Sequence, residues 1–520
     1  MTRTPQKGGH TLVIDGSEIS LQQIVRVARG EAAVEIDTGA EFTAHMEQSR
    51  DVLIHALERE SPVYGVTTGF GKCCGKRMIS EVAEQNGINL IRFHGCGTGA
   101  PFDAEETRAA MVCRLACFAR GYSGVSMELM QKIAELLNAD ITPVVPSEGS
   151  VGASGDLTPM SYVAAVLMGE RQVFYRGRQM PAAEALAGAG ISPHRFFPKE
   201  PLAIMNGTAM MTGVAAIVLD RAEKIANAAT DATALCIHAI GGNSHHYYPA
   251  ISRAKPHPGQ KDAATRIAEV LSSDAPPESF AINGPDTLQD PYSLRCAPQV
   301  IGVLTDALEW VRQWLSIEAN SANDNPLFDP ESGSVLMGGN FYGGHVSFAM
   351  DGLKSALASV ADMADRQVAL MVDANVNRGL PADLVGVEDP EKPFHHGFKA
   401  MSISASALAA EALKQTMPAA SFSRSTESHN QDKVSMGTIA ARDAKRICEL
   451  AEKTVAICLL AGLQACELRG SLEQRTKLAE LVSILREIAP PTIADRPMDT
   501  DIDSLSSAIE DSGIFTSAPC

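Results

Sequence analysis

The segment GASGD, residues 152–156, carries residue types that could build an electrophile from the chain itself. A tight bend would bring the amide nitrogen of Gly155 onto the carbonyl carbon of Ala153 and close a five-membered ring. Loss of that carbonyl oxygen and of the Ser154 hydroxyl as two waters would leave a methylidene group conjugated to the ring. Glycine tolerates the close backbone approach, and serine supplies the leaving hydroxyl. An ordinary Gly/Ser loop is the alternative, which composition by itself favours.

Other short motifs are too weak to indicate a bound cofactor or a metal. GCGTGA at residues 95–100 is similar to a dinucleotide fingerprint, but it follows a helix-like stretch and no βαβ pattern surrounds it. The pairs His245-His246 and His395-His396 lack a third ligand at metal-binding spacing, so surface or structural histidines are favoured. The sequence contains neither a Walker loop nor a GxSxG nucleophile motif. We therefore expect no metal.

The elements that must position these residues change character near residue 205. Before it, short strands are predicted at 11–16 and 34–37, and a hairpin at 172–180 with its turn at Arg176-Gly177. After it, apolar residues recur at spacings of three and four, which is typical of long amphipathic helices. These helices are predicted at 208–228, 345–372 and about 438–468. Polar joints rich in glycine and proline are predicted at 252–262, 272–295, 321–344 and 383–400.

Composition excludes several classes of function. The 520 residues include 62 acidic and 44 basic side chains, and this net charge of −18 argues against binding to nucleic-acid phosphates. No segment approaches the roughly 18 apolar residues that span a bilayer, so no membrane partner is expected. The N-terminal residues lack the apolar region of a secretory signal. Eleven scattered cysteines favour reduced thiols and a cytoplasmic location. The long apolar helices favour a homo-oligomer.

A resemblance then decides between the loop and the electrophile. GSVGASGDLTPMSYVA, residues 149–164, resembles the signature of the aromatic amino acid ammonia-lyases, a family of histidine, phenylalanine and tyrosine ammonia-lyases and related aminomutases. Six further segments match family motifs in the same order: YGVTTGFG (64–71), NGT (206–208), QDPYSLRCAPQ (289–299), NDNPLF (323–328), GGNFYGGH (338–345) and ESHNQDKVSMG (427–437). The likeness covers nearly the whole chain.

The resemblance implies both the cofactor and the fold. Ala153-Ser154-Gly155 would cyclise autocatalytically to 4-methylideneimidazole-5-one, with no added cofactor. The implied fold is mainly α, a long-helix bundle of the aspartase/fumarase-like type with a smaller mixed α/β N-terminal part. Residues 1–205 would carry the lid loop and the prosthetic group, and residues 206–520 would form the helical bundle and the oligomerisation part. A homotetramer with active sites shared between subunits is implied, as is a small aromatic amino acid as substrate.

Family motifs also imply the site residues. Tyr64, in a glycine-rich loop that suits a mobile lid, would act with the tripeptide and remove the β-proton of the substrate. A phenol with a pKa near ~10 needs that pKa lowered, or a substrate proton made more acidic. Tyr292 would orient the ring and the amine, and Arg295 would clamp the carboxylate with its planar fork. The other implied binding residues are Phe93, His94, Asn206, Gln289, Phe341, Glu427 and Gln431.

The resemblance also implies a role for several of these binding residues. Asn206 and Gln289 would hydrogen-bond the substrate or the prosthetic ring, and Phe341 would pack beside that ring. Glu427 and Gln431 lie four residues apart, so both would point into the pocket from one helix face if this segment is helical.

Two positions bear on the choice of amino acid. Phe93 makes an apolar wall that favours an unsubstituted ring, whereas His94 stands where histidine enzymes keep theirs. A polar contact from His94 to a ring hydroxyl or an imidazole stays open beside simple packing. Gln431 stands where histidine enzymes usually carry Glu. We therefore expect L-phenylalanine to be converted to trans-cinnamate, with tyrosine or 3,4-dihydroxyphenylalanine second and histidine third.

Two alternatives to a lyase remain open from the sequence. The loop reads YGVTTGFGKCCGK where family members often read YGVNTGFGG, so Cys73 and Cys74 follow the lid and could alter its mobility. A stiffer lid would retain the product and allow ammonia to add back, which is the aminomutase outcome. A catalytically inactive helical scaffold is the third possibility.

Overall fold

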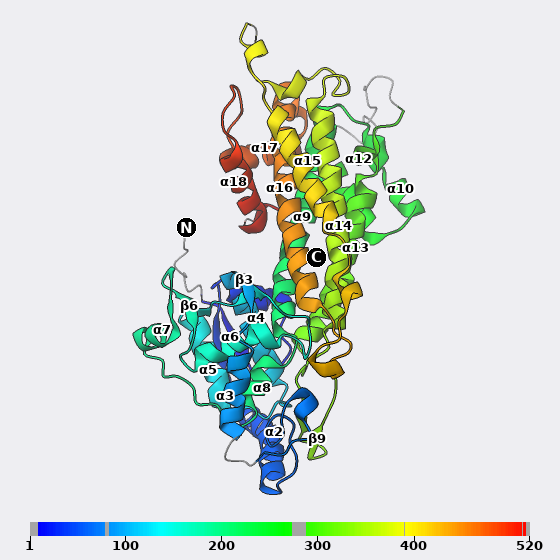
Figure 1. Cartoon of the computed structure of the whole chain (residues 1–520). Helices are drawn as coiled ribbons and strands as arrows, with labels where there is room; N and C mark the ends of the chain where they lie inside the picture. Colours follow the sequence, from blue (N-terminus) through cyan, green and yellow to red (C-terminus); the bar gives the residue numbers. More distant parts are fainter. Residues whose placement is uncertain (1–8, 79–82, 273–287, 389, 512, 516–520) are drawn as a thin grey trace. The chain divides into compact units, whose positions relative to one another are not determined.

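The computed structural model describes residues 9–78, 83–272, 288–388, 390–511 and 513–515 (Figure 1). The chain forms two compact units, and each is assembled from three separate stretches. The first unit comprises Met1–Val218, Arg312–Asp351 and Pro418–Arg442. The second comprises Leu219–Val311, Gly352–Met417 and Asp443–Cys520.

The first unit combines short strands with helices. Its helices are α1 Leu21–Ala28, α2 Ala40–Glu58, α3 Ala83–Phe93, α4 Ala104–Ala119, α5 Met127–Asn138, α6 Leu157–Leu167, α7 Ala182–Ala189 and α8 Glu200–Met205. Its strands are β1 Thr11–Ile14, β2 Ala33–Ile36, β3 Thr98–Pro101, β4 Thr142–Pro143, β5 Pro146–Glu148, β6 Gln172–Tyr175, β7 Arg178–Pro181, β8 Leu327–Asp329 and β9 Ser334–Leu336. The strands form four small sheets, ordered β1-β2, β3-β5, β4-β6-β7 and β8-β9.

Both early strands and the hairpin confirm the sequence predictions. β1 and β2 pair in parallel with Thr11 opposite Ala33, and β6 and β7 pair antiparallel with Tyr175 opposite Arg178. The hairpin turns at Arg176 and Gly177, which both have positive φ, as a two-residue turn between twisted strands requires.

Helix α4 is the buried centre of this unit, because nearly all of its residues from Glu106 to Ala119 are inaccessible to solvent. A capping box fixes its start: Asp103 accepts a hydrogen bond from the Glu106 N–H, and the Glu106 carboxylate accepts one from the Asp103 N–H. The helix thereby holds its side chains at defined positions inside the unit.

Four long helices are each divided between the two units: α9 Ala209–Ala239, α13 Ala297–Ala319, α14 Gly344–Val372 and α16 Gly437–Arg469. The remaining helices of the second unit are α10 Pro249–Ala254, α11 Pro258–Val270, α12 Tyr292–Arg295, α15 Lys399–Lys414, α17 Thr476–Ile488 and α18 Asp499–Asp511. Figure 1 shows the long helices running alongside one another. Inside the second unit, Gln367 of α14 donates to Thr233 of α9 at 2.9 Å.

The mainly α fold and the long helices confirm the expected class. The predicted joint at 252–262 is wrong in part, since α10 and α11 occupy most of it and each begins with a proline at its first turn, where no N–H is needed. Of the predicted joint at 272–295, residues 273–287 lie outside the described residues. Among the residues that are described, no helix is both long and apolar enough to cross a bilayer.

Candidate active site

The Ala153-Ser154-Gly155 tripeptide lies in the tight connection between β5 and α6, and its backbone is bent. Ser154 and Gly155 have φ values of +49° and +73°. The Gly207 N–H donates to the Ser154 carbonyl at 3.1 Å, and the Asp156 N–H donates to the Gly207 carbonyl at 2.7 Å. A Cβ on Gly155 would stand 2.0 Å from the Gly207 oxygen, so no other residue fits there. The bend and the lack of a side chain at Gly155 fit the geometry that ring closure needs.

Asp156 ends this connection as a fully buried carboxylate that the sequence analysis did not select. It accepts hydrogen bonds from the Met211 N–H at 2.9 Å and from Thr438 Oγ1 at 2.7 Å. Burial raises the pKa of Asp156 to about 6, against the effect of these hydrogen bonds. Its position directly after the tripeptide was the signal that could have identified it.

Tyr64 lies in a turn of the first unit, with its hydroxyl facing the lid backbone. The Gly71 N–H donates a hydrogen bond to Tyr64 Oη at 2.8 Å. Burial raises the pKa of the phenol, the hydrogen bond from Gly71 opposes that rise, and nearby Cys74 and Glu427 add to it. Of the two routes that sequence analysis left for a phenolic base, the structure therefore does not supply the lowered pKa. The role of Tyr64 as the base stays a prediction.

Glu427 is tied to the lid backbone. Its carboxylate accepts two hydrogen bonds from the Lys72 N–H, at 2.9 and 3.2 Å, and Lys72 Nζ donates to Ser428 Oγ at 2.8 Å. Glu427, Ser428 and His429 have φ values of +52°, +53° and +67°. The condition for a helix face shared by Glu427 and Gln431 is therefore not met, since three consecutive left-handed residues form a strained turn and not an α-helix.

The same turn reaches the tripeptide. Gln431 Nε2 lies 3.5 Å from Ser154 Oγ, and Gln431 Oε1 accepts a hydrogen bond from Thr426 Oγ1 at 3.0 Å. The strained turn thus contacts both the lid and the tripeptide. Within the first unit, the structure brings Tyr64, Glu427 and Gln431 together with Ser154.

Asn206 follows α8 and is held by the NDNP segment. Its amide nitrogen donates to Asp324 Oδ1 at 3.1 Å and to the Asn325 carbonyl at 3.0 Å, which leaves Oδ1 for other partners. Asp324 also pairs at 2.6 Å with Lys199, and both side chains are fully buried. Sequence analysis missed Lys199, which carries no motif signal of its own.

Phe93 is the last residue of α3, and His94 follows it. Phe93 is 60% exposed, and its ring centroid lies 4.3 Å from that of His94. His94 Nδ1 donates to the Leu90 carbonyl at 2.9 Å, which assigns the proton to Nδ1 and leaves Nε2 as an acceptor. Burial lowers the pKa of His94, so the neutral form is favoured. β3 pairs with β5, so the chain directly after His94 runs beside the chain that leads into the tripeptide.

Phe341 is half-buried in the loop before α14. Its neighbour Gly343 packs closely against Met211, whose backbone N–H binds Asp156. Phe341 therefore lies on a loop of the same unit that reaches the surroundings of Asp156.

Gln289, Tyr292 and Arg295 lie close together in the second unit. Tyr292 is 72% exposed, and the Arg295 guanidinium lies 4.8 Å from the centre of its ring. Arg295 Nε has no hydrogen-bond partner among the described residues, so a donor remains for a carboxylate. Asp290 fixes the segment by accepting hydrogen bonds from the Asn243 N–H and from Arg378. Their action in one site with the tripeptide stays a prediction.

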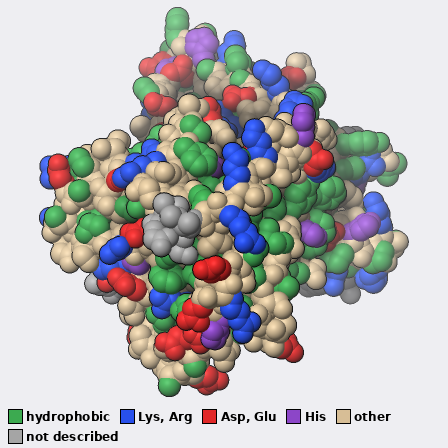
Figure 2. Space-filling model, turned by 60° about the horizontal axis from the view of Figure 1, so that its bottom comes forward, with side chains coloured by type: hydrophobic (Ala, Val, Ile, Leu, Met, Phe, Trp, Pro, Cys, Tyr) green, Lys and Arg blue, Asp and Glu red, His purple; other side chains and the backbone are tan. Residues whose placement is uncertain are grey.

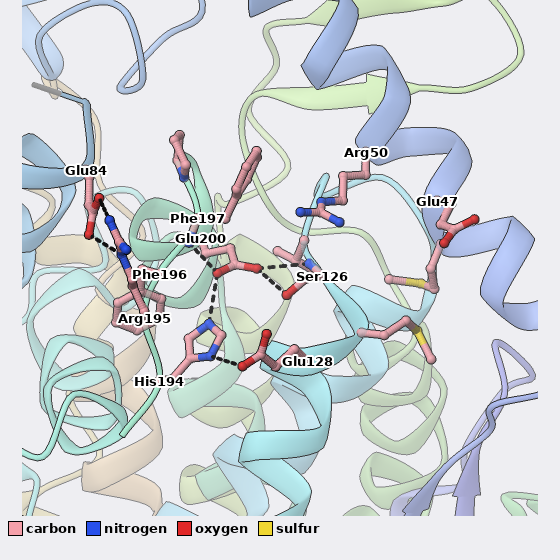
Figure 3. Close-up of a pocket in the computed structure, with 14 residues that line it drawn as sticks. Glu47, Arg50, Glu84, Ser126, Glu128, His194, Arg195, Phe196, Phe197 and Glu200 are labelled. Atoms are coloured by element: carbon pink, nitrogen blue, oxygen red, sulfur yellow. Dashed lines mark hydrogen bonds and ion pairs between the residues drawn. The ribbon is translucent and has the colours of Figure 1, made fainter. Parts of the chain in front are cut away.

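A cavity of about 430 Å³ also lies in the first unit, and none of the predicted site residues lines it (Figure 3). At its wall, the buried Glu200 carboxylate accepts hydrogen bonds from Ser126 Oγ at 2.6 Å and the Phe197 N–H at 2.8 Å, and lies 3.0 Å from His194 Nε2. Glu200 is the first residue of α8, the helix that leads to Asn206. These contacts fix α8 at its start.

Comparison with known proteins identifies the family. The model of the family described as "Aromatic amino acid lyase" matches residues 19–487. The chain belongs to the aromatic amino acid lyase family. It is 37% identical over 500 residues to a histidine ammonia-lyase of Gloeobacter violaceus, covering 96% of each chain.

Solved structures of the family have the same fold. A tyrosine aminomutase from Streptomyces globisporus superposes with a TM-score of 0.88 at 34% identity, covering 96% of this chain and 97% of that one. A histidine ammonia-lyase from Trypanosoma cruzi superposes with a TM-score of 0.87 at 30% identity, covering 97% and 94%.

Membership establishes the type of reaction and the source of the electrophile. The lyase breaks a carbon–nitrogen bond, and its electrophile forms autocatalytically from Ala153-Ser154-Gly155 without an added cofactor. When formed, that group makes the amine of the substrate a better leaving group. The expected preference for phenylalanine is not supported, because the similar relatives are histidine ammonia-lyases.

Proposed function

We propose that this lyase removes ammonia from L-histidine. The observation that carries the proposal is the tautomer of His94: with its proton on Nδ1, the Nε2 lone pair can accept a hydrogen bond from the N–H of an imidazole ring. A phenyl ring has no such donor and would leave His94 Nε2 without this hydrogen bond. The histidine ammonia-lyases among its relatives support the same choice.

Tyrosine is the second candidate. Its phenol hydroxyl can donate to the same nitrogen of His94, and a tyrosine aminomutase shares the fold at 34% identity. Gln431, in place of the carboxylate usual in histidine enzymes, and the apolar Phe93 fit a phenolic ring at least as well as an imidazole. The lyase and aminomutase outcomes then differ only in whether ammonia adds back before the product leaves.

The remaining roles belong to this proposal. Tyr64 removes the β-proton, Arg295 holds the carboxylate, and the other residues named from the family motifs surround the substrate. A homotetramer with shared active sites, in the cytoplasm, completes it. Exposed apolar side chains on α13, α14 and α15 support association, among them Val303, Phe348 and Ile403. Figure 2 shows one face on which apolar side chains lie among charged ones of both signs.

A substrate panel tests this proposal. Histidine, tyrosine, phenylalanine and 3,4-dihydroxyphenylalanine are supplied separately, and kcat/KM is measured from the absorbance of the unsaturated product. Histidine is expected to exceed phenylalanine by about 10²-fold or more, since an unpaired polar group in the site penalises phenylalanine. His94→Leu is expected to remove most of that difference.

Other results point elsewhere. A preference for tyrosine supports the second candidate, and chromatography that finds a β-amino acid instead of free unsaturated acid identifies an aminomutase. A preference for phenylalanine that His94→Leu does not change would contradict the part given to His94.

A further inference from the structure

Arg114 is a fully buried arginine on α4 that none of the predicted roles explains. Its Nη1 donates a hydrogen bond to the Asn206 carbonyl at 3.0 Å and lies 3.5 Å from Asn323 Oδ1. The other two guanidinium nitrogens, Nε and Nη2, make no hydrogen bond within the described part of the chain. Burying a guanidinium without full pairing is unfavourable. The position therefore needs a reason beyond packing.

The guanidinium packs directly against Gly207. A Cβ built on Gly207 would stand 2.6 Å from Arg114 Nη2. Gly207 in turn donates to the carbonyl of Ser154 and accepts from the N–H of Asp156. Two hydrogen bonds thus join the tripeptide connection to a residue that Arg114 holds in place.

Arg114 also acts on the buried charge beside the tripeptide. Burial raises the pKa of Asp156, and the positive charge of Arg114 opposes that rise. The Phe118 ring lies 5.7 Å from the Arg114 guanidinium carbon and adds a weak attraction for the cation. Arg114 therefore places a positive charge next to Gly207, the residue that hydrogen-bonds the bent backbone of Ser154 and Asp156.

Ring closure depends on that backbone being fixed. The lone pair of the Gly155 nitrogen forms a bond to the Ala153 carbonyl carbon, and the Ala153 oxygen leaves as water with the protons of the Gly155 and Ser154 nitrogens. The Ser154 hydroxyl leaves as a second water with the Ser154 Cα proton, and no oxidant or reductant is needed. An amide nitrogen is a poor nucleophile, so holding it against the carbonyl is worth a large factor in rate.

We propose that Arg114 is a positioning residue for formation of the electrophile: it holds Asn206-Gly207 against Ser154-Gly155 and so keeps the tripeptide in the bent form from which the ring closes. Arg114 touches none of the reacting atoms in the structure, and it acts through Gly207.

The intact mass of the purified chain tests this role, because ring formation lowers the mass by two waters. Arg114→Met keeps the length of the side chain but removes the charge and the donors. We expect it to fold and to keep the unmodified mass. Arg114→Lys keeps the charge without the planar fork, and we expect its ring to form up to about tenfold more slowly than in wild type. Mass spectra taken at intervals after cell-free synthesis measure this rate.

Arg108→Met is the matched control. Arg108 is a second buried arginine of α4, but it donates to the carbonyls of Val27, Ala28 and Leu137, away from the tripeptide. This variant should lose thermal stability and still reach the mass of the complete ring. No substrate is used, so the result does not depend on which amino acid the enzyme prefers.

The outcomes separate a positioning role from a general effect on folding. Complete rings in both Arg114 variants at the wild-type rate would overturn the proposal. The proposal would also be overturned if Arg108→Met and Arg114→Met had the same thermal stability and the same fraction of chains without the ring. If Arg114→Met does not fold, the rate of ring formation in Arg114→Lys decides.

Discussion

Tyr64 is a weaker acid in this protein than in water, and this affects the pH dependence of catalysis. Burial raises its pKa above the ordinary value, and Cys74 and Glu427 raise it further. In the proposed role of Tyr64 as the base, its phenolate would be a minor form at neutral pH, and the phenolate fraction would rise about tenfold for each pH unit below the pKa.

We predict that kcat rises with pH from neutral into the alkaline range. Glu427→Gln removes a negative charge that raises the pKa of Tyr64, so the rise should move to lower pH. Tyr64→Phe should lower kcat by about 10²–10⁴-fold. Ser428→Ala leaves the charge of Glu427 in place and serves as the control for the pH profile. A rise in Glu427→Gln at the same pH as in wild type would contradict the effect assigned to this charge.

At the scale of elements, the loop around Lys72, the proposed lid, is joined to the strained turn by hydrogen bonds. The Glu427 carboxylate binds the Lys72 N–H, and Lys72 Nζ binds Ser428. These side chains are exposed, so water weakens the contacts, and together they contribute on the order of 1 kcal/mol to holding the loop against the turn. Since Gln431 of the same turn lies beside Ser154, the position of the lid and the surroundings of the tripeptide are linked.

We predict that Glu427→Ala opens the lid more often. Trypsin cuts after Lys72, Lys76 and Arg77, so cleavage at these sites should become about tenfold faster, the factor that corresponds to ~1.4 kcal/mol. Mass spectrometry of the fragments measures this rate, and Lys132→Ala, which alters a salt bridge on another helix, is the control. Equal rates in Glu427→Ala and wild type would show that the carboxylate does not hold the lid.

At the scale of the molecule, exposed apolar side chains on α13, α14 and α15 indicate which surface the single chain leaves uncovered. Ile403 on α15 is 66% exposed, and Phe348 and Val303 are exposed on α14 and α13. Apolar side chains contribute most to association when they lie at the centre of an interface, where water is excluded. They support the proposed homotetramer.

We predict that Ile403→Glu weakens the association, because a charge would be buried in the interface. Light scattering after size exclusion should show a species smaller than that of wild type at low micromolar concentration. Val13→Glu, in β1 of the first unit, replaces an exposed apolar residue outside the long helices and is the control. An unchanged molar mass for Ile403→Glu would place the interface elsewhere.

The sequence by itself determined the features that depend on neighbouring residues. The chemistry of Ala153-Ser154-Gly155 is contained in three consecutive residues, and the long helices follow from the spacing of their apolar residues. The hairpin at Arg176-Gly177 follows from local turn chemistry, since both residues accept positive φ there. The motifs in their order also indicated the family, which the comparison confirmed.

Only the tertiary structure decided how residues far apart in the sequence act together. Gly155 meets Gly207, Arg114 packs against Gly207, and Lys199 pairs with Asp324. No periodicity encodes these contacts, because they arise when separate elements pack and bury polar groups that must then find partners. For the same reason the left-handed turn from Glu427 to His429 could not be read from the spacing of Glu427 and Gln431. Local spacing describes what a segment prefers, whereas packing decides which strained backbone a site retains.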